Sequence, residues 1–196
     1  MSSQEFNLLL ASNSPRRKEL LEQLGFSFTA IGSDIDESVK QHEDPITYVK
    51  RMAIEKAQKQ NTKSNTIVLG SDTCVVCHNH ILGKPTDFNE ANAMLSMLSG
   101  NTHQVLTAIA VAQQDEVSVE VVTTNVTFKT LSQQEIMNYW QTDEPKDKAG
   151  SYGIQGIAGQ FVTSIEGSYS AVVGLPLYET AQLLAKHGCP SPMTKN

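Results

Sequence analysis

The first half of the chain alternates strand-like and helix-like segments, and this alternation restricts the fold more than any other feature of the sequence. Apolar residues at 8–11 predict a short buried strand. A helix follows, because Ser14 is a good N-cap and Pro15 suits the first helical position. A second strand at 26–31 and a second helix that begins at Pro45 repeat the pattern. Strands that alternate with helices in this way predict an α/β domain.

Later in the chain the alternation ends, because the predicted strands at 104–112 and 117–128 follow each other with no helix between them. A strand at 66–76 is rich in β-branched residues and is interrupted by the polar sequence Gly70-Ser71-Asp72-Thr73. The remaining predicted elements are a hairpin with its turn at 78–80, helices at 89–98, 132–141 and 175–187, and strands at 104–112, 117–128 and 160–165. A pair of adjacent long strands favours a mixed central sheet with flanking helices over an all-parallel sheet.

Composition predicts one folded domain. Hydrophobic residues make up 39% and charged residues 18% of the 196 residues, as in globular proteins. With no internal repeat and no linker, we expect a single domain over 1–188, followed by a loose tail at 189–196. No apolar run approaches the roughly 20 residues of a membrane helix. The N-terminal residues 1–5 are acidic where a secretory signal would be basic, so we expect a cytoplasmic protein without a membrane partner.

The charge distribution argues against nucleic acid as a partner, since the net charge is −6 and nucleic-acid surfaces need clustered lysine and arginine. The three arginines, Arg16, Arg17 and Arg51, all lie in the first quarter of the chain. They can build a local anion pocket there or simply lie on solvated helices.

A cluster of cysteine and histidine residues matches patterns for haem attachment and zinc binding, but we expect neither. Cys74-Val75-Val76-Cys77-His78 matches a short haem-attachment pattern, and His80 adds a zinc-ligand type. Haem attachment of this kind belongs to exported proteins, and Cys74 and Cys77 are three apart in a predicted strand, where side chains point to opposite faces.

The start of the first helix has the composition of a triphosphate-binding site. A helix N-terminus favours anions, and Ser12 and Ser14 add hydroxyl donors. Arg16 and Arg17 add guanidinium groups that match phosphate oxygens. The alternative is an ordinary capped helix with two exposed arginines.

Acidic residues supply a second set of candidates. Asp34, Asp36 and Glu37 follow a predicted strand, whereas Asp72 interrupts an apolar one, where aspartate is unfavourable. Phosphates are commonly bound with Mg²⁺ held by one or two carboxylates, and such a carboxylate can also deprotonate water. The alternative for Asp72 is a turn residue, and for the others a solvated loop.

Two lysines complete the set. Lys56 lies on the second helix, and Lys84 is fixed between Gly83 and Pro85; either can neutralise charge on phosphate oxygens. No P-loop sequence occurs, and no Gly-x-Ser-x-Gly elbow indicates a serine nucleophile.

Taken together, these residues resemble the Maf family from Leu8 to about His187. The order and spacing of the matching blocks are specific, although each block alone is weak. The blocks are Leu10-Ala11-Ser12-Asn13-Ser14-Pro15-Arg16-Arg17, Asp36-Glu37, Glu55-Lys56-Ala57, Gly70-Ser71-Asp72-Thr73, Gly83-Lys84-Pro85, Ser99-Gly100 with His103, Asp147-Lys148-Ala149-Gly150, Tyr152-Gly153-Ile154-Gln155-Gly156, and Gly167-Ser168-Tyr169 through Val173-Gly174-Leu175-Pro176.

The resemblance implies a fold similar to inosine triphosphate pyrophosphatases, with two lobes around a cleft. It implies a hydrolase of nucleotide metabolism that cleaves a nucleoside triphosphate between the α and β phosphates, by attack of water at the α-phosphate, with Mg²⁺ or Mn²⁺. By this resemblance Asp72 is the proton acceptor, and Glu37, Lys56 and Lys84 contribute to catalysis or to phosphate and metal binding. Glu37 and Asp72 are then the metal ligands.

Substrate choice follows from three positions by the same resemblance. Relatives that act on dTTP and UTP carry the residues found here as Arg16, Thr73 and Gln155, whereas relatives directed to 7-methyl-GTP carry Trp, Gln and Glu. A glutamine amide offers a donor and an acceptor to the O4/N3–H edge of thymine or uracil. The open alternatives are a 7-methyl-GTP pyrophosphatase and a non-catalytic nucleotide-binding regulator of septum formation. A homodimer is also left open.

Overall fold

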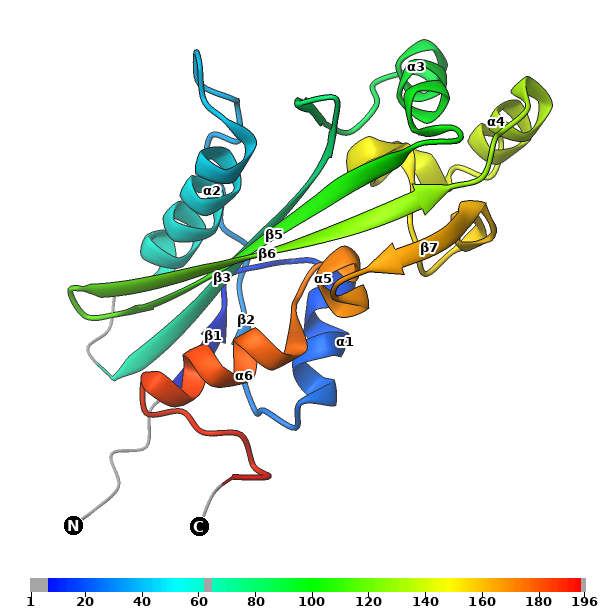
Figure 1. Ribbon diagram of the computed structural model, residues 1–196. Coiled ribbons are helices and arrows are strands. Elements are labelled where there is room, and N and C mark those ends of the chain that lie inside the picture. The colour runs from blue at the N-terminus through cyan, green and yellow to red at the C-terminus, as the bar shows by residue number, and fades with distance from the viewer. Residues whose placement is uncertain (1–6, 62–64, 195–196) are drawn as a thin grey trace. The chain divides into compact units, whose positions relative to one another are not determined.

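The computed structural model describes residues 7–61 and 65–194, so residues 1–5 and the end of the predicted tail, 195–196, lie outside the described residues. Figure 1 shows the elements along the chain. The strands are β1 (Asn7–Leu10), β2 (Thr29–Ala30), β3 (Thr66–Cys77), β4 (His80–Leu82), β5 (Thr102–Gln113), β6 (Glu116–Phe128) and β7 (Val162–Glu166). The helices are α1 (Pro15–Gln23), α2 (Pro45–Gln60), α3 (Phe88–Leu98), α4 (Gln133–Trp140), α5 (Tyr169–Val173) and α6 (Leu177–Lys186), with short 3-10 helices η1 (Glu144–Asp147), η2 (Ala149–Ser151) and η3 (Ile157–Phe161).

The predicted mixed α/β fold is confirmed by the strand pairing. The strand order is β2-β1-β3-β5-β6-β7, with β4 paired to β3. β1 lies parallel to both β2 and β3, with Leu10 opposite Leu69, whereas β4 and β7 are antiparallel to their neighbours. β5 and β6 are joined by only two residues, Gln114 and Asp115, a connection that suits a hairpin.

The chain forms two compact units, each built from separate stretches of sequence. The first contains the residues up to Asp72, 107–122 and those from Gly174 onward; the second contains 73–106 and 123–173. The single catalytic domain predicted over 1–188 stays a prediction. Within the part of the chain that the structure describes, no helix is long and apolar enough to cross a membrane.

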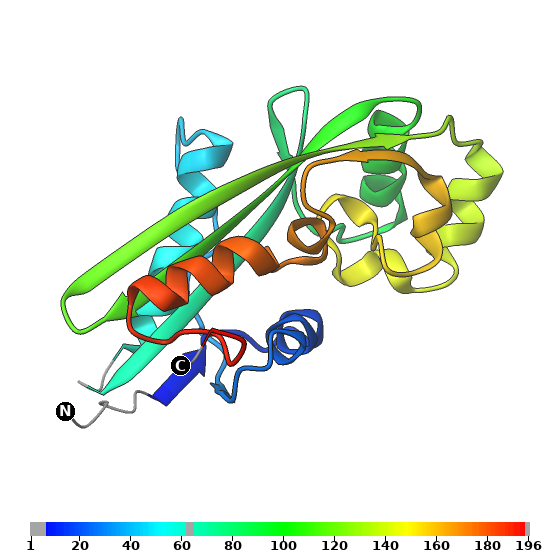
Figure 2. The same ribbon diagram turned by 60° about the horizontal axis from the view of Figure 1, so that its bottom comes forward.

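The first unit contains a parallel β-α-β-α-β arrangement from β1 to the start of β3, together with the adjoining ends of β5 and β6 and helix α6. Figures 1 and 2 show α2 on one face of the sheet and α6 on the other. Its core side chains are fully buried, among them Leu10, Leu21, Met52, Ile67 and Leu69. β1 ends at Leu10, opposite Leu69, whereas β3 continues to Cys77, so the chain after Leu10 leaves the sheet where β3 runs on.

The second unit has an aromatic core. Phe128 packs edge-on against His103, Tyr152 and Phe161, and Tyr139 packs against Phe161 in the same way. Ring pairs of this geometry stabilise the fold beyond the contribution of the buried apolar area alone.

Several predicted boundaries differ from the structure. The strand expected at 26–31 is reduced to β2, because pairing with β1 reaches only Thr29 and Ala30. The strand expected at 160–165 starts at Val162, after η3. Helix α4 carries a capping box, with Ser132 and Glu135 bonded reciprocally. By contrast, Ser14 is the N-cap of α1 but makes no side-chain cap bond within the described chain.

Candidate active site

A glycine allows helix α2 to lie directly against strand β3. A Cβ atom at Gly70 would lie 2.8 Å from the backbone nitrogen of Ala57 and closer still to the carbonyl oxygen of Ala53. Only glycine therefore permits this approach without a backbone shift. Lys56 precedes Ala57, and Asp72 is two residues beyond Gly70, on the same face of β3. The close packing of α2 against β3 therefore brings the Lys56 side chain within contact distance of Asp72.

Lys56 lies between two carboxylates. Its Nζ is 2.7 Å from Asp72 Oδ1 and 2.6 Å from Glu37 Oε1. Lys56 and Asp72 are each 8% exposed, whereas the Glu37 side chain is 49% exposed. One ammonium therefore neutralises a buried carboxylate and an accessible one, and fixes both oxygens close together.

The loop that carries Glu37 is tied to helix α2. Tyr48 Oη donates to the Glu37 carbonyl oxygen at 3.1 Å, and Arg51 Nη2 donates to the Ser38 carbonyl oxygen at 2.9 Å. Arg51 also pairs with Glu43 at 2.6 Å, a bond that lowers the pKa of Glu43 to about 2. Arg51 therefore anchors the loop and does not join Arg16 and Arg17. Sequence reasoning missed this role, although the neighbouring acidic stretch offered a signal for it.

The acidic residues before Glu37 have a different role. Asp36 Oδ1 accepts from the Ser38 backbone nitrogen at 2.9 Å, and this bond lowers the pKa of the exposed Asp36 carboxyl. Asp36 thus closes a local turn, as the solvated-loop alternative expected. Asp34 is exposed.

The N-terminus of α1 is held by one carbonyl group from the C-terminal part of the chain. Gly174 O accepts from Arg17 Nε at 2.9 Å and from Ser71 Oγ at 3.0 Å. Ser12 Oγ accepts from the Ser14 backbone nitrogen at 3.1 Å and lies 3.5 Å from Arg17 Nη1. The Arg17 guanidinium is thereby oriented by its Nε edge. The importance of Gly174 was not predicted.

Electrostatics link this helix start to the carboxylates. Burial lowers the pKa of the Arg17 guanidinium; the charge of Asp72 opposes this shift, Arg16 adds to it, and Glu37 opposes it. The first unit therefore brings together six predicted site residues in one electrostatic neighbourhood, with Ser14 beside them: Ser12, Arg16, Arg17, Glu37, Lys56 and Asp72.

Three predicted site residues belong to the second unit. Thr73 follows Asp72 on β3 and is half-buried, whereas Lys84 and Gln155 are exposed. The Gly83 carbonyl next to Lys84 accepts from the Gly150 backbone nitrogen at 3.0 Å, which fixes this segment within its own unit. The roles of Thr73, Lys84 and Gln155 in a shared site stay predictions.

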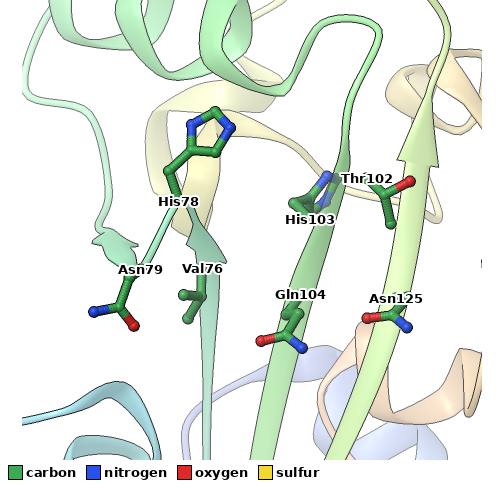
Figure 3. Close-up of a pocket in the computed structure, with 7 residues that line it drawn as sticks. All are labelled: Val76, His78, Asn79, Thr102, His103, Gln104 and Asn125. Atoms are coloured by element: carbon green, nitrogen blue, oxygen red, sulfur yellow. The ribbon is translucent and has the colours of Figure 1, made fainter.

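A separate pocket of about 350 Å³ lies in the second unit (Figure 3). None of the predicted site residues lines it. Its lining residues are Val76, His78, Asn79, Thr102, His103, Gln104 and Asn125. The predicted turn at one rim is confirmed, with positive φ at His78 and Asn79 and pairing of Cys77 with His80. Cys74 and Cys77 are buried, and burial raises the pKa of the Cys77 thiol.

Comparison with known proteins gives matches over nearly the whole chain. A family model described as "Maf-like protein" matches residues 7–187. A dTTP/UTP pyrophosphatase from Colwellia psychrerythraea is 59% identical over 187 residues, which cover 92% of this chain and 88% of the relative. The protein of the same name from Pseudoalteromonas translucida is 62% identical over 177 residues (89% and 94% covered). A third, from Vibrio parahaemolyticus, is 54% identical over 180 residues (91% and 95%).

Among solved structures, a nucleoside-triphosphatase (dITP/XTP pyrophosphatase) from Mycobacterium abscessus matches at 16% identity and a TM-score of 0.44. The match covers 64% of this chain and 76% of that one.

Proposed function

The chain belongs to the Maf family, and on that premise we propose that it is a nucleoside triphosphate pyrophosphatase that hydrolyses dTTP and UTP to the monophosphate and pyrophosphate. The relatives named above carry this activity in their names. The observation that carries the proposal is the pairing of Lys56 with Glu37 and Asp72, in electrostatic range of Arg17 at the start of α1. This combination offers cations for phosphate and carboxylates for water and metal.

Each residue has a chemical task in this proposal. Ser12, Ser14, Arg16 and Arg17, with the backbone N–H groups at the start of α1, bind phosphate oxygens. Asp72 accepts the proton of the water that attacks the α-phosphate.

The lysines and the loop glutamate complete the proposed set. Lys56 orients the Asp72 carboxylate through its 2.7 Å contact. Lys84 neutralises charge that develops on the leaving pyrophosphate, and Glu37 contributes from its anchored loop.

The carboxylates also fit a divalent cation. Glu37 Oε1 and Asp72 Oδ1 both lie within 2.7 Å of one ammonium nitrogen, so a small cation of higher charge suits the same pair of oxygens. Oxygen donors favour Mg²⁺ or Mn²⁺, and Mg²⁺ is usually held by one or two carboxylates together with water and substrate phosphates. Glu37 and Asp72 would hold this ion, which when bound would neutralise phosphate charge and polarise the scissile bond.

Base selection rests on Arg16, Thr73 and Gln155 in the proposal. The exposed Gln155 amide presents a donor and an acceptor, which complement the O4/N3–H edge of a pyrimidine. We further propose a cytoplasmic enzyme that works without nucleic acid.

A nucleotide panel tests the proposal. The protein is incubated with dTTP, UTP, 7-methyl-GTP, dATP and GTP in Mg²⁺ or Mn²⁺, and released pyrophosphate is measured, with chelator as control. We expect release from dTTP and UTP that the chelator abolishes. Release from neither would refute the proposal. Preference for 7-methyl-GTP would reassign the substrate, and nucleotide binding without any product would indicate a regulator.

A further inference from the structure

One carboxylate holds the segment that carries Gln155. Glu144, on η1, accepts from the Ile157 backbone nitrogen through Oε2 at 2.9 Å and from the Ala158 backbone nitrogen through Oε1 at 3.3 Å. These two amides begin η3, immediately after the turn in which the Gly156 nitrogen donates to Gly153 O at 3.0 Å. The Gln155 backbone thus lies in a turn whose far side is bound to Glu144.

A tyrosine extends the same contact to the near side of the turn. Tyr139 Oη donates to Glu144 Oε1 at 2.8 Å and accepts from the Gly153 backbone nitrogen at 3.3 Å. Burial, and then the bond to Glu144, raises the pKa of the Tyr139 phenol, so the hydroxyl keeps its proton. The pair Tyr139 and Glu144 therefore binds the turn on both sides of Gln155.

Glycine next to Gln155 makes room for the carboxylate. A Cβ atom at Gly156 would collide with both oxygens and the carboxyl carbon of Glu144. Before the turn, Tyr152 Oη lies 2.8 Å from Nε2 of the buried His103, which fixes the residue that leads into it. Gln155 is exposed, whereas Tyr152 and Gly153 before it and Ile157 and Ala158 after it are held by hydrogen bonds. A restrained backbone under an exposed amide is the arrangement that a recognition residue requires.

We propose that Glu144 is a positioning residue for substrate choice: it sets the backbone around Gln155 and thereby the direction in which the Gln155 amide points. This inference rests on the proposed function, because it assigns the amide to the nucleobase. Glu144 acts through backbone amides and Tyr139.

The test is a double-mutant cycle between Glu144→Gln and Gln155→Ala. The first substitution keeps the shape of the side chain but replaces one acceptor oxygen by an NH₂ group, which cannot accept from Tyr139 or a backbone amide. We measure kcat and KM for dTTP and for 7-methyl-GTP. Each single variant is expected to lower the ratio of kcat/KM values for dTTP over 7-methyl-GTP about tenfold, mainly through KM, and the double variant no further than Gln155→Ala alone.

Asp143→Asn is the matched control. Asp143 is the neighbouring carboxylate, pairs with Lys146, and has a left-handed backbone (φ 63°) that asparagine tolerates. This variant is expected to keep the wild-type ratio. Circular dichroism and thermal melting establish that each variant is folded; if Glu144→Gln does not fold, Tyr139→Phe takes its place in the cycle.

The outcomes separate the two proposals. If Gln155→Ala changes the ratio but Glu144→Gln does not, or if the two effects simply add, the positioning role is overturned. If the wild-type protein hydrolyses neither dTTP nor UTP, the proposed activity fails. Dissociation constants of the two nucleotides, measured by calorimetry, then decide the role of Glu144 through the same cycle.

Discussion

Replacement of Lys56 by methionine removes the shared cation and leaves two carboxylates facing each other. Lys56 Nζ contacts both Asp72 and Glu37, and the side chains of Lys56 and Asp72 are only 10% and 11% exposed. Methionine replaces the stem of lysine by an unbranched chain of similar shape without the ammonium, so the change tests mainly the charge.

The expected cost comes almost entirely from Asp72. Removal of one partner of a buried ion pair costs about 3–5 kcal/mol, and the lower end applies because the pair retains some exposure. The contact with Glu37 adds less than about 1 kcal/mol, since a half-exposed carboxylate is screened by water. We therefore expect Lys56→Met to lower the free energy of unfolding by about 3 kcal/mol, or the melting temperature by about 6–12 °C for a chain of this size.

Urea unfolding and calorimetry at pH 7 measure this loss, with Lys50→Met as the control. Lys50 is exposed on the same helix, and its replacement is expected to change stability by about 0.5 kcal/mol or less. Mn²⁺ at a hundredfold excess over its dissociation constant for the variant should recover about 2.7 kcal/mol in Lys56→Met. A Lys56→Met protein as stable as the Lys50→Met control would refute the reasoning.

Three further predictions concern the same framework. Asp72→Asn should lower pyrophosphate release by about 10²–10⁴-fold with an unchanged circular dichroism spectrum, and normal turnover would rule out Asp72 as proton acceptor. Burial lowers the pKa of His103 from 6.5 to about 4. Between these pH values the unfolded chain binds more protons than the folded one, so the free energy of unfolding falls as the pH is lowered. The loss amounts to about 3 kcal/mol between pH 6.5 and pH 4. Urea unfolding of His103→Gln should accordingly show a weaker fall in stability over that interval than the wild type, and parallel curves would contradict the assignment. Gly70→Ala should cost about 3 kcal/mol, because the new methyl group meets the backbone of Ala53, and a melting temperature within about 2 °C of wild type would speak against that contact.

The elements of the first unit could be predicted because local signals agree with the fold. Pro15 and Pro45 both stand at helix starts, and the Thr66–Cys77 strand is long and β-branched. The length of β2 could not be predicted, because its end depends on pairing with β1 and not on residues 26–31 themselves. Where the end of a strand is set by its pairing partner, the sequence of that strand alone does not predict where it ends.

The sequence predicted which residues belong to the candidate site, but not the packing that brings them together. Asp72 attracted attention as a carboxylate in an apolar strand, and its contact with Lys56 agrees with the chemistry expected there. The packing that makes this contact depends on Gly70, whose role appears only when α2 is placed against β3. The bonds by which Glu144 anchors the turn around Gln155 join residues 13 and 14 positions apart, beyond the reach of helical or strand periodicity.

The bond from Arg17 to Gly174 also bears on how the protein is made. The two residues are separated by 157 positions, so at about 5–20 residues per second roughly 8–30 seconds of synthesis pass between them. During that interval neither Arg17 nor Ser71 has this carbonyl acceptor. A nascent chain, or a fragment cleaved before Gly174, therefore lacks the group that orients the guanidinium at the start of α1. Completion of the proposed phosphate-binding segment is thus delayed until nearly the whole chain has been translated.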